Sequence, residues 1–303
     1  MFIINHRKIF FTLTGFLVLA SLACVFIFGL RFSIDFTGGT LVTFEYSNSL
    51  PPAPALDQSL TAAGFQDYSL LQNGTNGYDL RAQNLTDTER NDLTQILSIN
   101  NQYPATIESL NEIGPTIGAQ LRSDSVLAIS LVLICILLFI AFAFRKVSKP
   151  ISSWVYGAMA IVGLAHNVIV TTGFFALLSH FTDAQVDTLF VTAILTVLGF
   201  SVHDTIVVFD RVRENLRLNH EHNRKETFAD TAGRALNQTF VRSVNTSLTV
   251  VFTLAVLYAL GPASTQYFAL TLLVGIVAGT YSSLFLTTPL LVEIEKRRRT
   301  NVK

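Results

Sequence analysis

Residues 199–215 read GFSVHDTIVVFDRVREN, and they place a carboxylate inside an apolar segment. Asp204 lies before the apolar run has ended, whereas the charged residues that follow begin at Asp210. An ionised carboxylate at the centre of a membrane helix costs about 2.5–3.5 kcal/mol on insertion scales. A chain keeps such a group where a function or an ionic partner offsets the cost, so this stretch indicates a membrane helix with a functional charge.

The composition is typical of a protein that crosses a membrane several times. Of the 303 residues, 50% are hydrophobic and 14% are charged, whereas soluble domains contain roughly 25% charged residues. The formal net charge is +0, and the sequence has no basic cluster of the kind that binds nucleic acid. The two cysteines, Cys24 and Cys135, both lie in apolar segments, so we expect packing roles and no disulfide framework.

Six apolar segments are long enough to span a membrane as helices. They cover residues 9–30, 124–144, 151–178, 188–209, 239–260 and 267–290. The first has an apolar run longer than the 7–15 residues of a cleaved signal peptide, so we expect it to remain in the mature protein. Residues 210–238 are charged and are expected to form a helical connection in the cytoplasm, and residues 291–303 form a basic tail.

Lysine and arginine are distributed unevenly among the connecting segments. Seventeen of the 21 lie near the N-terminus, at 145–149, at 210–242 or in the tail. The other four lie between the first two spans and are Arg31, Arg81, Arg90 and Arg122. Because Lys and Arg are enriched in cytoplasmic loops, we expect both termini in the cytoplasm and residues 31–123 on the opposite side.

Residues 31–123 read as a small folded domain. Strands are expected at 39–46, 67–72, 78–83 and 103–110, and helices at 55–65 and 86–97. Thr86 stands three residues before Glu89, which predicts a capping box. The order strand–helix–strand–strand–helix–strand is that of an α+β ferredoxin-like domain. The domain carries no paired His, Cys or acidic motif, so we expect a binding or moving part.

Arg242 is the first candidate partner for Asp204. Counted from the cytoplasmic ends of the fourth and fifth spans, both residues lie at a similar depth, roughly 9 Å for Asp204. A static salt bridge is one interpretation, although buried pairs of this kind contribute little net stability. We favour a proton relay, because burial favours the neutral carboxyl and a nearby guanidinium favours the carboxylate. Movement of the arginine, or entry of water, would then switch the protonation state.

Polar residues flank both charges. On the fourth span they are Ser201, His203 and Thr205, and on the fifth they are Asn245, Thr246 and Ser247. One interpretation is a hydrated proton path, and the other is a set of interhelical hydrogen bonds worth about 0.6 kcal/mol each. His203 is a candidate relay because imidazole titrates near neutral pH, with a lining role as the alternative.

The remaining polar and small residues favour structural roles. We expect His166 to be a hydrogen-bonding core residue. We expect Asp187 and Thr188 to cap the fourth helix, with a proton entry point as the alternative. Gly275, Gly279 and Ser283 recur every four residues, which predicts close helix packing. No catalytic triad, phosphate-binding glycine loop or metal-ligand spacing is present, so we expect neither an enzyme nor a metal site. An intramembrane protease is the one enzymatic alternative.

Three stretches resemble the SecD/SecF family of protein-export membrane subunits, on the SecF side. FSIDFTGGT at 32–40 is similar to the opening motif of the family, and residues 199–215 are similar to its fourth-span signature. LNQTFVRSVNTSLTV at 236–250 is similar to its fifth-span signature. The resemblance covers nearly the whole chain in order and spacing. It departs at His203, where the family often has Asn.

The resemblance implies an assembly and an energy source. Such a subunit pairs with SecD in an arrangement similar to the RND transporters, each subunit giving six spans, and associates with the SecYEG channel. It uses the proton gradient, with no other cofactor, to draw an exported unfolded polypeptide across the bacterial inner membrane.

The resemblance also assigns residues. The functional aspartate and arginine of the family fall on Asp204 and Arg242, with a further carboxylate expected on SecD. The opening motif falls on Asp35, Gly38, Gly39 and Thr40.

Two other functions stay open at this point. The chain could be half of an RND-type small-molecule exporter, which a larger outward domain with an apolar pocket would favour. It could instead be a scaffold subunit of the translocon that moves no protons. Full activity of an Asp204→Asn variant would favour this scaffold function.

Overall fold

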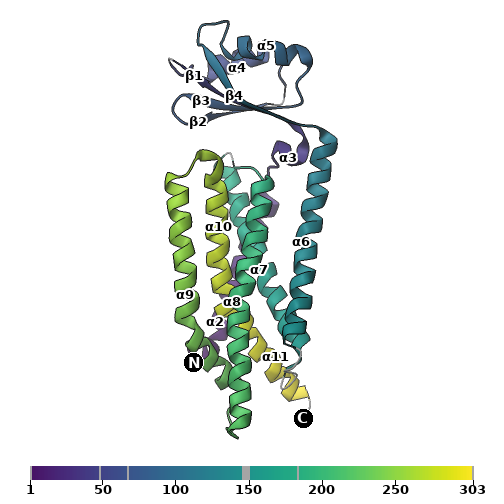
Figure 1. Ribbon diagram of the computed structural model, residues 1–303, viewed down its shortest axis with the longest axis vertical. Coiled ribbons are helices and arrows are strands. Elements are labelled where there is room, and N and C mark those ends of the chain that lie inside the picture. Colours follow the sequence, from purple (N-terminus) through teal and green to yellow (C-terminus); the bar gives the residue numbers. More distant parts are fainter. Residues whose placement is uncertain (1, 48, 67, 145–150, 183, 302–303) are drawn as a thin grey trace. The chain divides into compact units, whose positions relative to one another are not determined.

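The computed structural model describes residues 2–47, 49–66, 68–144, 151–182 and 184–301 (Figure 1). The basic loop at 145–149 and Lys303 lie outside the described residues. The chain divides into two compact units. The helical unit comprises Met1–Leu30, Ala128–Ala184 and Leu189–Lys303, and the sheet unit comprises Arg31–Leu127 and Gln185–Thr188.

Six helices in the described part of the chain are long and apolar enough to cross a membrane, which confirms the six predicted spans. After the short α1 (Phe2–Asn5) they are α2 (Arg7–Phe28), α6 (Pro115–Ala143), α7 (Ser153–Phe181), α8 (Thr188–Glu221), α9 (Phe228–Leu260) and a last helical segment. That segment consists of α10 (Ala263–Tyr281), the π-helical turn η1 (Ser282–Thr287) and α11 (Thr288–Asn301). The chain is therefore a mostly helical, multi-pass membrane protein.

The second span is longer than its apolar run. We expected it to begin at 124, but α6 begins at Pro115. Proline is well suited to the first position of a helix, since its fixed φ matches the helix and its missing N–H has no helical partner there. The polar residues 115–124 therefore extend the helix beyond the apolar segment.

The charged segment 210–238 is not the single helical connection that we expected. Instead, α8 continues to Glu221 and α9 starts at Phe228. Ion pairs spaced three or four residues apart, Arg211 with Glu214 and Arg217 with Glu221, accompany the continuation of α8. The turn between the helices contains Asn223 at φ 52°, a conformation that asparagine tolerates better than most residues.

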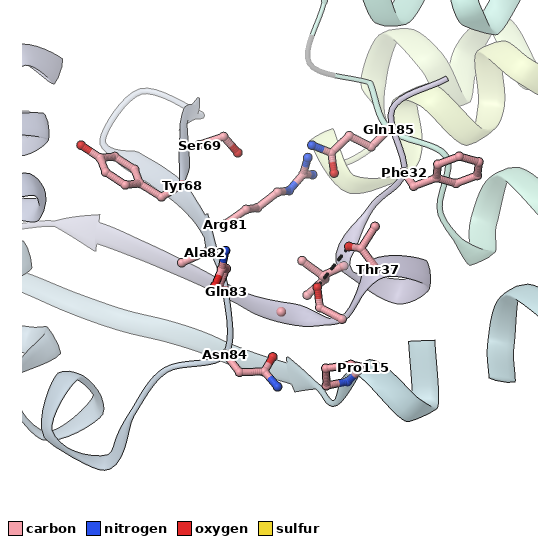
Figure 2. A pocket seen from close by; sticks show the side chains of 13 residues that line it. Phe32, Thr37, Tyr68, Ser69, Arg81, Ala82, Gln83, Asn84, Pro115 and Gln185 are labelled. Carbon is pink, nitrogen blue, oxygen red and sulfur yellow. Dashed lines mark hydrogen bonds between the residues drawn. The ribbon is translucent and has the colours of Figure 1, made fainter. Parts of the chain in front are cut away.

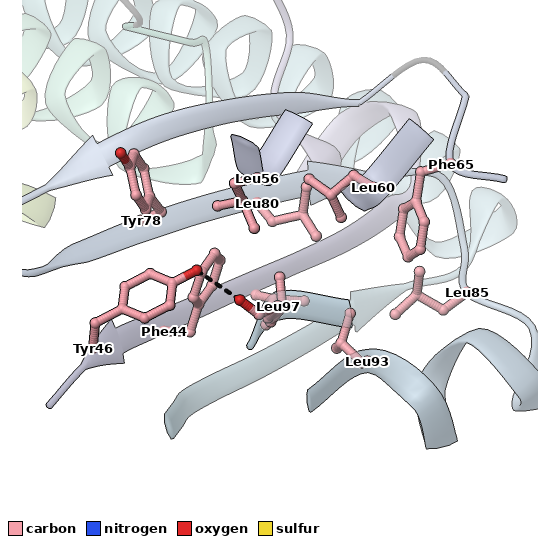
Figure 3. Close-up of a cluster of buried hydrophobic side chains, with 11 residues drawn as sticks. Phe44, Tyr46, Leu56, Leu60, Phe65, Tyr78, Leu80, Leu85, Leu93 and Leu97 are labelled. Carbon is pink, nitrogen blue, oxygen red and sulfur yellow. Dashed lines mark hydrogen bonds between the residues drawn. The ribbon is translucent and has the colours of Figure 1, made fainter. Parts of the chain in front are cut away.

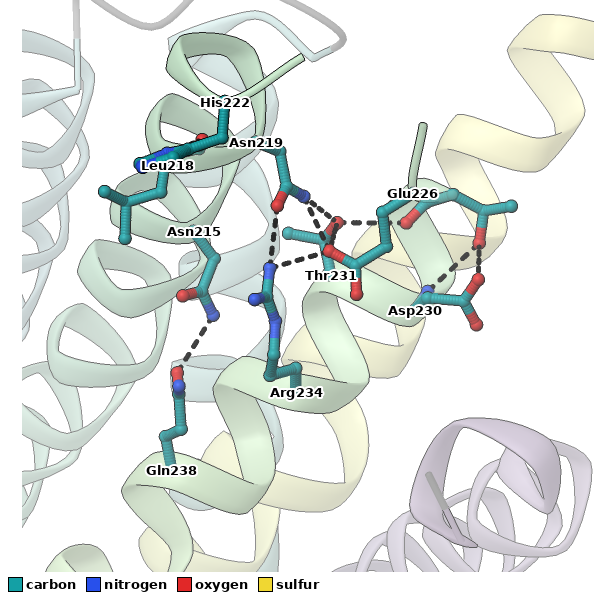
Figure 4. Close-up of polar contacts among 10 residues, drawn as sticks. Asn215, Leu218, Asn219, His222, Glu226, Asp230, Thr231, Arg234 and Gln238 are labelled. Atoms are coloured by element: carbon teal, nitrogen blue, oxygen red, sulfur yellow. Dashed lines mark hydrogen bonds and ion pairs between the residues drawn. The ribbon is translucent and has the colours of Figure 1, made fainter. Parts of the chain in front are cut away.

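A hydrogen-bonded cluster joins the two helices beside this turn (Figure 4). Arg234 donates to Glu226 Oε2 at 2.6 Å and to Asn219 Oδ1 at 3.0 Å, and Asn219 Nδ2 also donates to Glu226 Oε2 at 2.6 Å. One turn along, Asn215 Nδ2 donates to Gln238 Oε1 at 2.9 Å. These hydrogen bonds join the two helices of the α8–α9 hairpin, whereas Nε of Arg234 is buried without a hydrogen-bond partner among the described residues.

The last helical segment carries a π-helical turn that the sequence reading did not predict. The predicted span at 267–290 is confirmed, and within it the turn Ser282–Thr287 separates α10 from α11. Pro289 follows two residues later, and it has no N–H to donate and would clash with the carbonyl four residues before it in an α-helix. Widening of the preceding turn relieves that clash, and such turns are frequent at functional sites.

The sheet unit contains four antiparallel strands and two helices. In chain order they are β1 (Gly39–Tyr46), α4 (Ala53–Ala62), β2 (Ser69–Asn73), β3 (Gly77–Ala82), α5 (Asp87–Leu97) and β4 (Ala105–Ile113), preceded by the short α3 (Ile34–Thr37). The order of elements is as predicted, and the strands lie in the order β2-β3-β1-β4. The predicted capping box of α5 is confirmed between Thr86 and Glu89.

One face of the sheet packs against both helices (Figure 3). Alternate residues of β1, among them Phe44 and Tyr46, are buried with Leu56 of α4 and Leu93 of α5. The Tyr46 hydroxyl donates to the Leu97 carbonyl at 2.8 Å. Burial raises the pKa of Tyr46 above its usual value, so this hydroxyl stays protonated and keeps its hydrogen bond.

Candidate functional site

Asp204 is buried in the helical unit, with 2% of its surface exposed. Ser201 and Val208 share its face of α8 and are also buried, as is the adjacent Thr205. Residues three and four positions apart lie on one side of a helix, so this burial follows from the helical repeat. The carboxylate therefore lies inside the bundle and not at a lipid-exposed surface.

Two hydroxyl groups from neighbouring helices lie nearest to the carboxylate. Ser247 of α9 donates to Asp204 Oδ2 at 3.5 Å, which is long for a hydrogen bond. The same Ser247 Oγ lies 2.5 Å from Thr280 Oγ1 of α10, so α8, α9 and α10 meet around Asp204. Hydroxyl groups can donate or accept, so they can serve either protonation state of a carboxyl.

The expected ion pair between Asp204 and Arg242 is not formed. Among the described residues, the one basic group within 4.0 Å of the carboxylate is the His203 ring, with Nδ1 at 3.9 Å from Oδ1. Arg242 is exposed, because the buried face of α9 carries Thr239, Ser243 and Ser247. Ser247 is the residue of α9 that meets Asp204, so Arg242 lies more than one helical turn away along α9 and on its exposed side.

The other flanking residues do not all approach Asp204. His203 has a side chain 58% exposed, against 2% for Asp204, so the two side chains diverge as expected on a helix. Asn245 is exposed, and Thr246 Oγ1 donates to the Arg242 carbonyl of its own helix at 2.9 Å. Of the predicted run 245–247, only Ser247 contacts the carboxylate.

Sequence reasoning missed Ser243 and Thr280. Ser243 is 1% exposed, and its Oγ has no hydrogen-bond partner in the described part of the chain. Its spacing of four residues from Ser247 is the signal that would have shown that both share one face. Thr280 lies one residue after Gly279 in the predicted small-residue ridge, but a lone threonine there carries no distinguishing pattern.

A second polar layer surrounds Ser201 and Thr205. His166 Nδ1 lies 3.0 Å from Asn167 Oδ1, and Asn167 Nδ2 donates to Ser201 Oγ at 2.6 Å. Thr205 Oγ1 lies 2.9 Å from Ser283 Oγ in η1. His166 and Asn167 are buried, and hydrogen bonds thus link α7, α8 and η1 one turn before Asp204 and at the residue that follows it.

Two glycines allow α10 to approach α8 closely. A Cβ at Gly279 would lie 3.1 Å from Ser201 Cβ, and a Cβ at Gly275 would lie 2.3 Å from Val197 Cγ2. The second distance is shorter than real Cβ contacts allow, so any side chain there would displace a neighbour. Small residues at this interface therefore hold the hydroxyl groups of α10 within reach of Asp204.

The residues of the opening motif lie in the sheet unit. Asp35 Oδ2 accepts hydrogen bonds from the Thr188 N–H at 2.9 Å and from Thr188 Oγ1 at 3.0 Å. Thr188 is therefore the donor in both hydrogen bonds of this contact. Gly38 has φ 78°, and Gly39 has φ 136° with a Cβ position only 2.6 Å from the Ala82 carbonyl. Thr40 is fully buried beside them in β1.

No group of three His, Cys, Asp or Glu side chains suited to a metal ion occurs among the described residues. The arrangement around Asp204 instead offers one carboxyl and several hydroxyls, which can bind and release a proton.

Comparison with known families covers most of the chain. The family described as "Protein export membrane protein SecD/SecF, C-terminal" matches residues 94–297, and the "SecD/SecF GG Motif" matches residues 25–49. The second match includes Asp35, Gly38 and Gly39. The chain belongs to the SecD/SecF family.

Members of the SecD/SecF family resemble this chain in sequence and in fold. The protein translocase subunit SecF of Thermobaculum terrenum is 39% identical over 97% of this chain and 94% of its own length. A crystal structure of SecDF from Thermus thermophilus aligns with a TM-score of 0.83 at 30% identity, over 97% of this chain. A super-membrane-facing form of SecDF aligns with a TM-score of 0.69 at 31% identity. The chain spans 38% and 39% of those two longer chains.

Proposed function

We propose that this chain is the SecF-type subunit of a bacterial protein-export complex, and that Asp204 couples the transmembrane proton gradient to polypeptide movement. Relatives that align over nearly their full length are named protein translocase subunit SecF. A solved relative is described as a translocon-associated membrane protein. The observation that carries the proton-coupling part is the burial of Asp204, at 2% exposure, without an ion-pair partner closer than 3.9 Å among the described residues.

A buried carboxylate without a close cation is costly, and protonation removes that cost. The arrangement around Asp204 therefore favours the neutral acid, which can donate its proton to Ser247 Oγ. Entry of water, or approach of a cation, would favour release of the proton. One elementary charge that crosses a potential of 100 mV supplies about 2.3 kcal/mol, enough to shift such a two-state equilibrium.

We propose that Arg242 also takes part in proton coupling, from the exposed face of α9. An arginine left exposed on an apolar helix needs a polar or acidic neighbour, and we propose that SecD supplies this neighbour. Arg242→Gln is expected to reduce gradient-driven export while the protein still inserts and accumulates normally. Full coupling in this variant would exclude Arg242 from the mechanism, and loss of the folded protein would favour a structural role.

The partners follow from the same family membership. We propose pairing with SecD, because a relative in Thermus thermophilus is a single SecDF chain of which this chain covers 37%. The SecYEG channel, the exported polypeptide and the lipid bilayer complete the assembly, and nucleic acid has no part. We propose that both termini lie in the cytoplasm, because Lys and Arg are in excess in the corresponding segments.

The sheet unit is proposed to be a ferredoxin-like domain on the outer side of the membrane. Its antiparallel order β2-β3-β1-β4, with both helices on one face, supports this classification. We propose further that the chain is not an enzyme and uses no cofactor, the proton gradient being its energy source.

The test compares Asp204→Asn with a control on the same helix. The control is Asp210→Asn, whose carboxylate is 62% exposed. Inverted membrane vesicles that contain SecD and the translocon would report export of a precursor and proton flux with a pH-sensitive dye. Asp204→Asn should abolish gradient-dependent export and the accompanying proton flux, whereas Asp210→Asn should retain both.

The outcomes separate the proposal from its alternatives. If Asp204→Asn retains gradient-dependent export and proton flux at the wild-type level, the proton relay is wrong and the scaffold function gains support. A small-molecule exporter would instead lose drug efflux in Asp204→Asn and leave precursor export unchanged.

A further inference from the structure

The sheet unit contains a cavity of about 620 Å³ on the face of the sheet that the helices leave free (Figure 2). Its lining includes Arg81, Ser69, Gln83, Asn84 and Gln185. Among the residues that the structure describes, none that lines the cavity is acidic, whereas the segment from Asp35 to Asp124 contains 11 Asp and Glu residues. The cavity is therefore a positively charged site in an otherwise acidic domain.

Arg81 reaches this cavity because of its position in β3. It pairs with Leu41 of β1 and with Ser69 of β2, while Leu80 beside it is fully buried under the helices. Side chains alternate between the two faces of a strand, so Arg81 points away from the core. Figure 2 shows its guanidinium extending toward Gln185.

The guanidinium of Arg81 is incompletely satisfied. Its Nη1 is buried and has no hydrogen-bond partner among the described residues. Two of the three other arginines of the unit have a contact: Arg90 forms an ion pair with Glu112, and Arg122 lies 5.5 Å over the Phe32 ring. A buried cationic donor without an acceptor is costly, and a carboxylate would offer two parallel hydrogen bonds to its fork.

Space for a ligand results from the two glycines of the opening motif. Gly38 and Gly39 both line the cavity. A Cβ at Gly38 would lie 2.9 Å from Pro115 Cα, and one at Gly39 would lie 3.0 Å from Ile34 Cγ2. The absence of side chains at these positions lets the backbone of β1 run close to its neighbours and keeps the cavity beside Arg81 open.

The strand beside the cavity is an open edge. β2 is at one end of the sheet order, and its first residue, Ser69, lines the cavity. Its sequence SLLQN contains no charge and no proline, the usual protections of an exposed edge, whereas β4 at the other edge carries Glu108 and Glu112. An extended peptide can add to such an edge through main-chain hydrogen bonds, with side-chain pockets that give selectivity.

We propose that this cavity binds an acidic side chain of an extended polypeptide that adds to β2, with Arg81 as the carboxylate-binding residue. The occupant is a segment of the exported chain, and that identity rests on the function proposed above. Arg81 supplies the charge and the planar fork, Ser69 and the amide side chains Gln83 and Asn84 supply further polar contacts, and the β2 backbone supplies sequence-independent ones.

The test measures peptide binding to the full chain in lipid nanodiscs by fluorescence anisotropy. The probe is an end-blocked, labelled decapeptide of Val, Thr and Ser with one central Glu, and its match has Gln in place of Glu. The wild-type chain should bind the Glu peptide about tenfold more tightly. Arg81→Gln should abolish this preference, and Arg81→Lys should retain only part of it, because lysine lacks the bidentate fork.

A matched variant keeps the experiment specific. Arg90→Gln removes another arginine of the same unit and should bind both peptides as the wild type does. Equal binding of the two peptides by the wild type, or an unchanged preference in Arg81→Gln, would overturn the proposal. The binding experiment contains no proton gradient. A negative result would therefore leave the proposed proton coupling intact, and a preference that depends on Arg81 would stand even if the proton coupling were wrong.

The occupant is tested in membranes that carry the whole export complex. A photo-reactive phenylalanine analogue in place of Ser69 should cross-link to a precursor that is stalled during export. The cross-link should be stronger when the precursor segment outside the membrane carries Glu than when it carries Gln. Cross-links to a partner subunit in place of the precursor would show that a fixed intersubunit contact fills the site, and would overturn the exported chain as occupant.

Discussion

Asp35 accepts two hydrogen bonds from Thr188, from the backbone N–H at 2.9 Å and from Oγ1 at 3.0 Å, across 153 residues of sequence. Both residues belong to the sheet unit, and Thr188 is also the first residue of α8, the helix that carries Asp204. The first N–H groups of a helix have no partner inside it, and a carboxylate near them is favourable for the helix dipole. The aspartate of the opening motif is thus a cap for α8 supplied from far away in the chain.

Asp35→Ala is expected to lower the free energy of unfolding by about 1–2 kcal/mol, the usual effect of losing a helix cap. Thr188→Ala removes only the Oγ1 donor and should cost less. A denaturant titration in detergent micelles of both variants and of the double variant would measure their coupling. Because the two residues share a contact, the effects should not add. Strict additivity would show that the hydrogen bonds do not contribute to stability.

Gly275→Ala should destabilise the helical unit, because the new methyl group would lie 2.3 Å from Val197 Cγ2. Valine is restricted to few rotamers in a helix, so the helices must separate, and overpacking of this kind costs about 1–3 kcal/mol. The matched control is Gly199→Ala, where nothing lies within 4 Å and the higher helix propensity of alanine should be neutral or stabilising. Thermal unfolding followed by circular dichroism would compare the two, and an equally stable Gly275→Ala would contradict the close approach of α10 to α8.

Glu226→Gln should loosen the turn between α8 and α9. Glu226 Oε2 accepts hydrogen bonds from Arg234 and from Asn219 (Figure 4). Loss of such charge-assisted hydrogen bonds lowers the free energy of unfolding by about 1–3 kcal/mol. Hydrogen exchange of the backbone amides in the turn should become faster. The control Glu221→Gln breaks the ion pair with Arg217. The side chain of Glu221 is 53% exposed and that of Arg217 is 70% exposed, so this change should have little effect on the exchange rates. Equal exchange in both variants would mean that the cluster does not hold the turn.

The capping box of α5 should give the sheet unit a pH dependence below neutrality. Hydrogen bonds from the Thr86 backbone and hydroxyl lower the pKa of Glu89 below its usual 4.5. The contribution of Glu89 is therefore complete above pH 4.5, the value expected in the unfolded chain, and is lost as the pH falls through the lower pKa of the folded state.

Hydrogen exchange of α5, corrected for the intrinsic rate at each pH, should show this loss in the wild type. Glu89→Gln should show none, because its side chain does not titrate. The same acid sensitivity in both proteins would assign the effect to another group.

The local elements of this protein could be predicted because they rest on short-range patterns. The apolar runs predicted six helices, and the alternation and turns between residues 31 and 123 predicted the order of strands and helices. The capping box needs only Thr86 and Glu89, three residues apart on one helix. Depth in a membrane helix also follows from residue counting, which is why the burial of Asp204 was expected.

The tertiary structure decided what depends on rotation of one helix against another. Residue counting paired Asp204 with Arg242, but the packing of α9 brings Ser247 against Asp204 and leaves Arg242 exposed. The π-helical turn before Pro289 places Ser283 against Thr205, which no repeat in the sequence indicated. By itself the sequence determined that a carboxylate is buried in the membrane, because that requires only an apolar run around it. Which side chains surround the carboxylate depends on contacts among α8, α9 and α10, and these are set by packing between residues far apart in the chain.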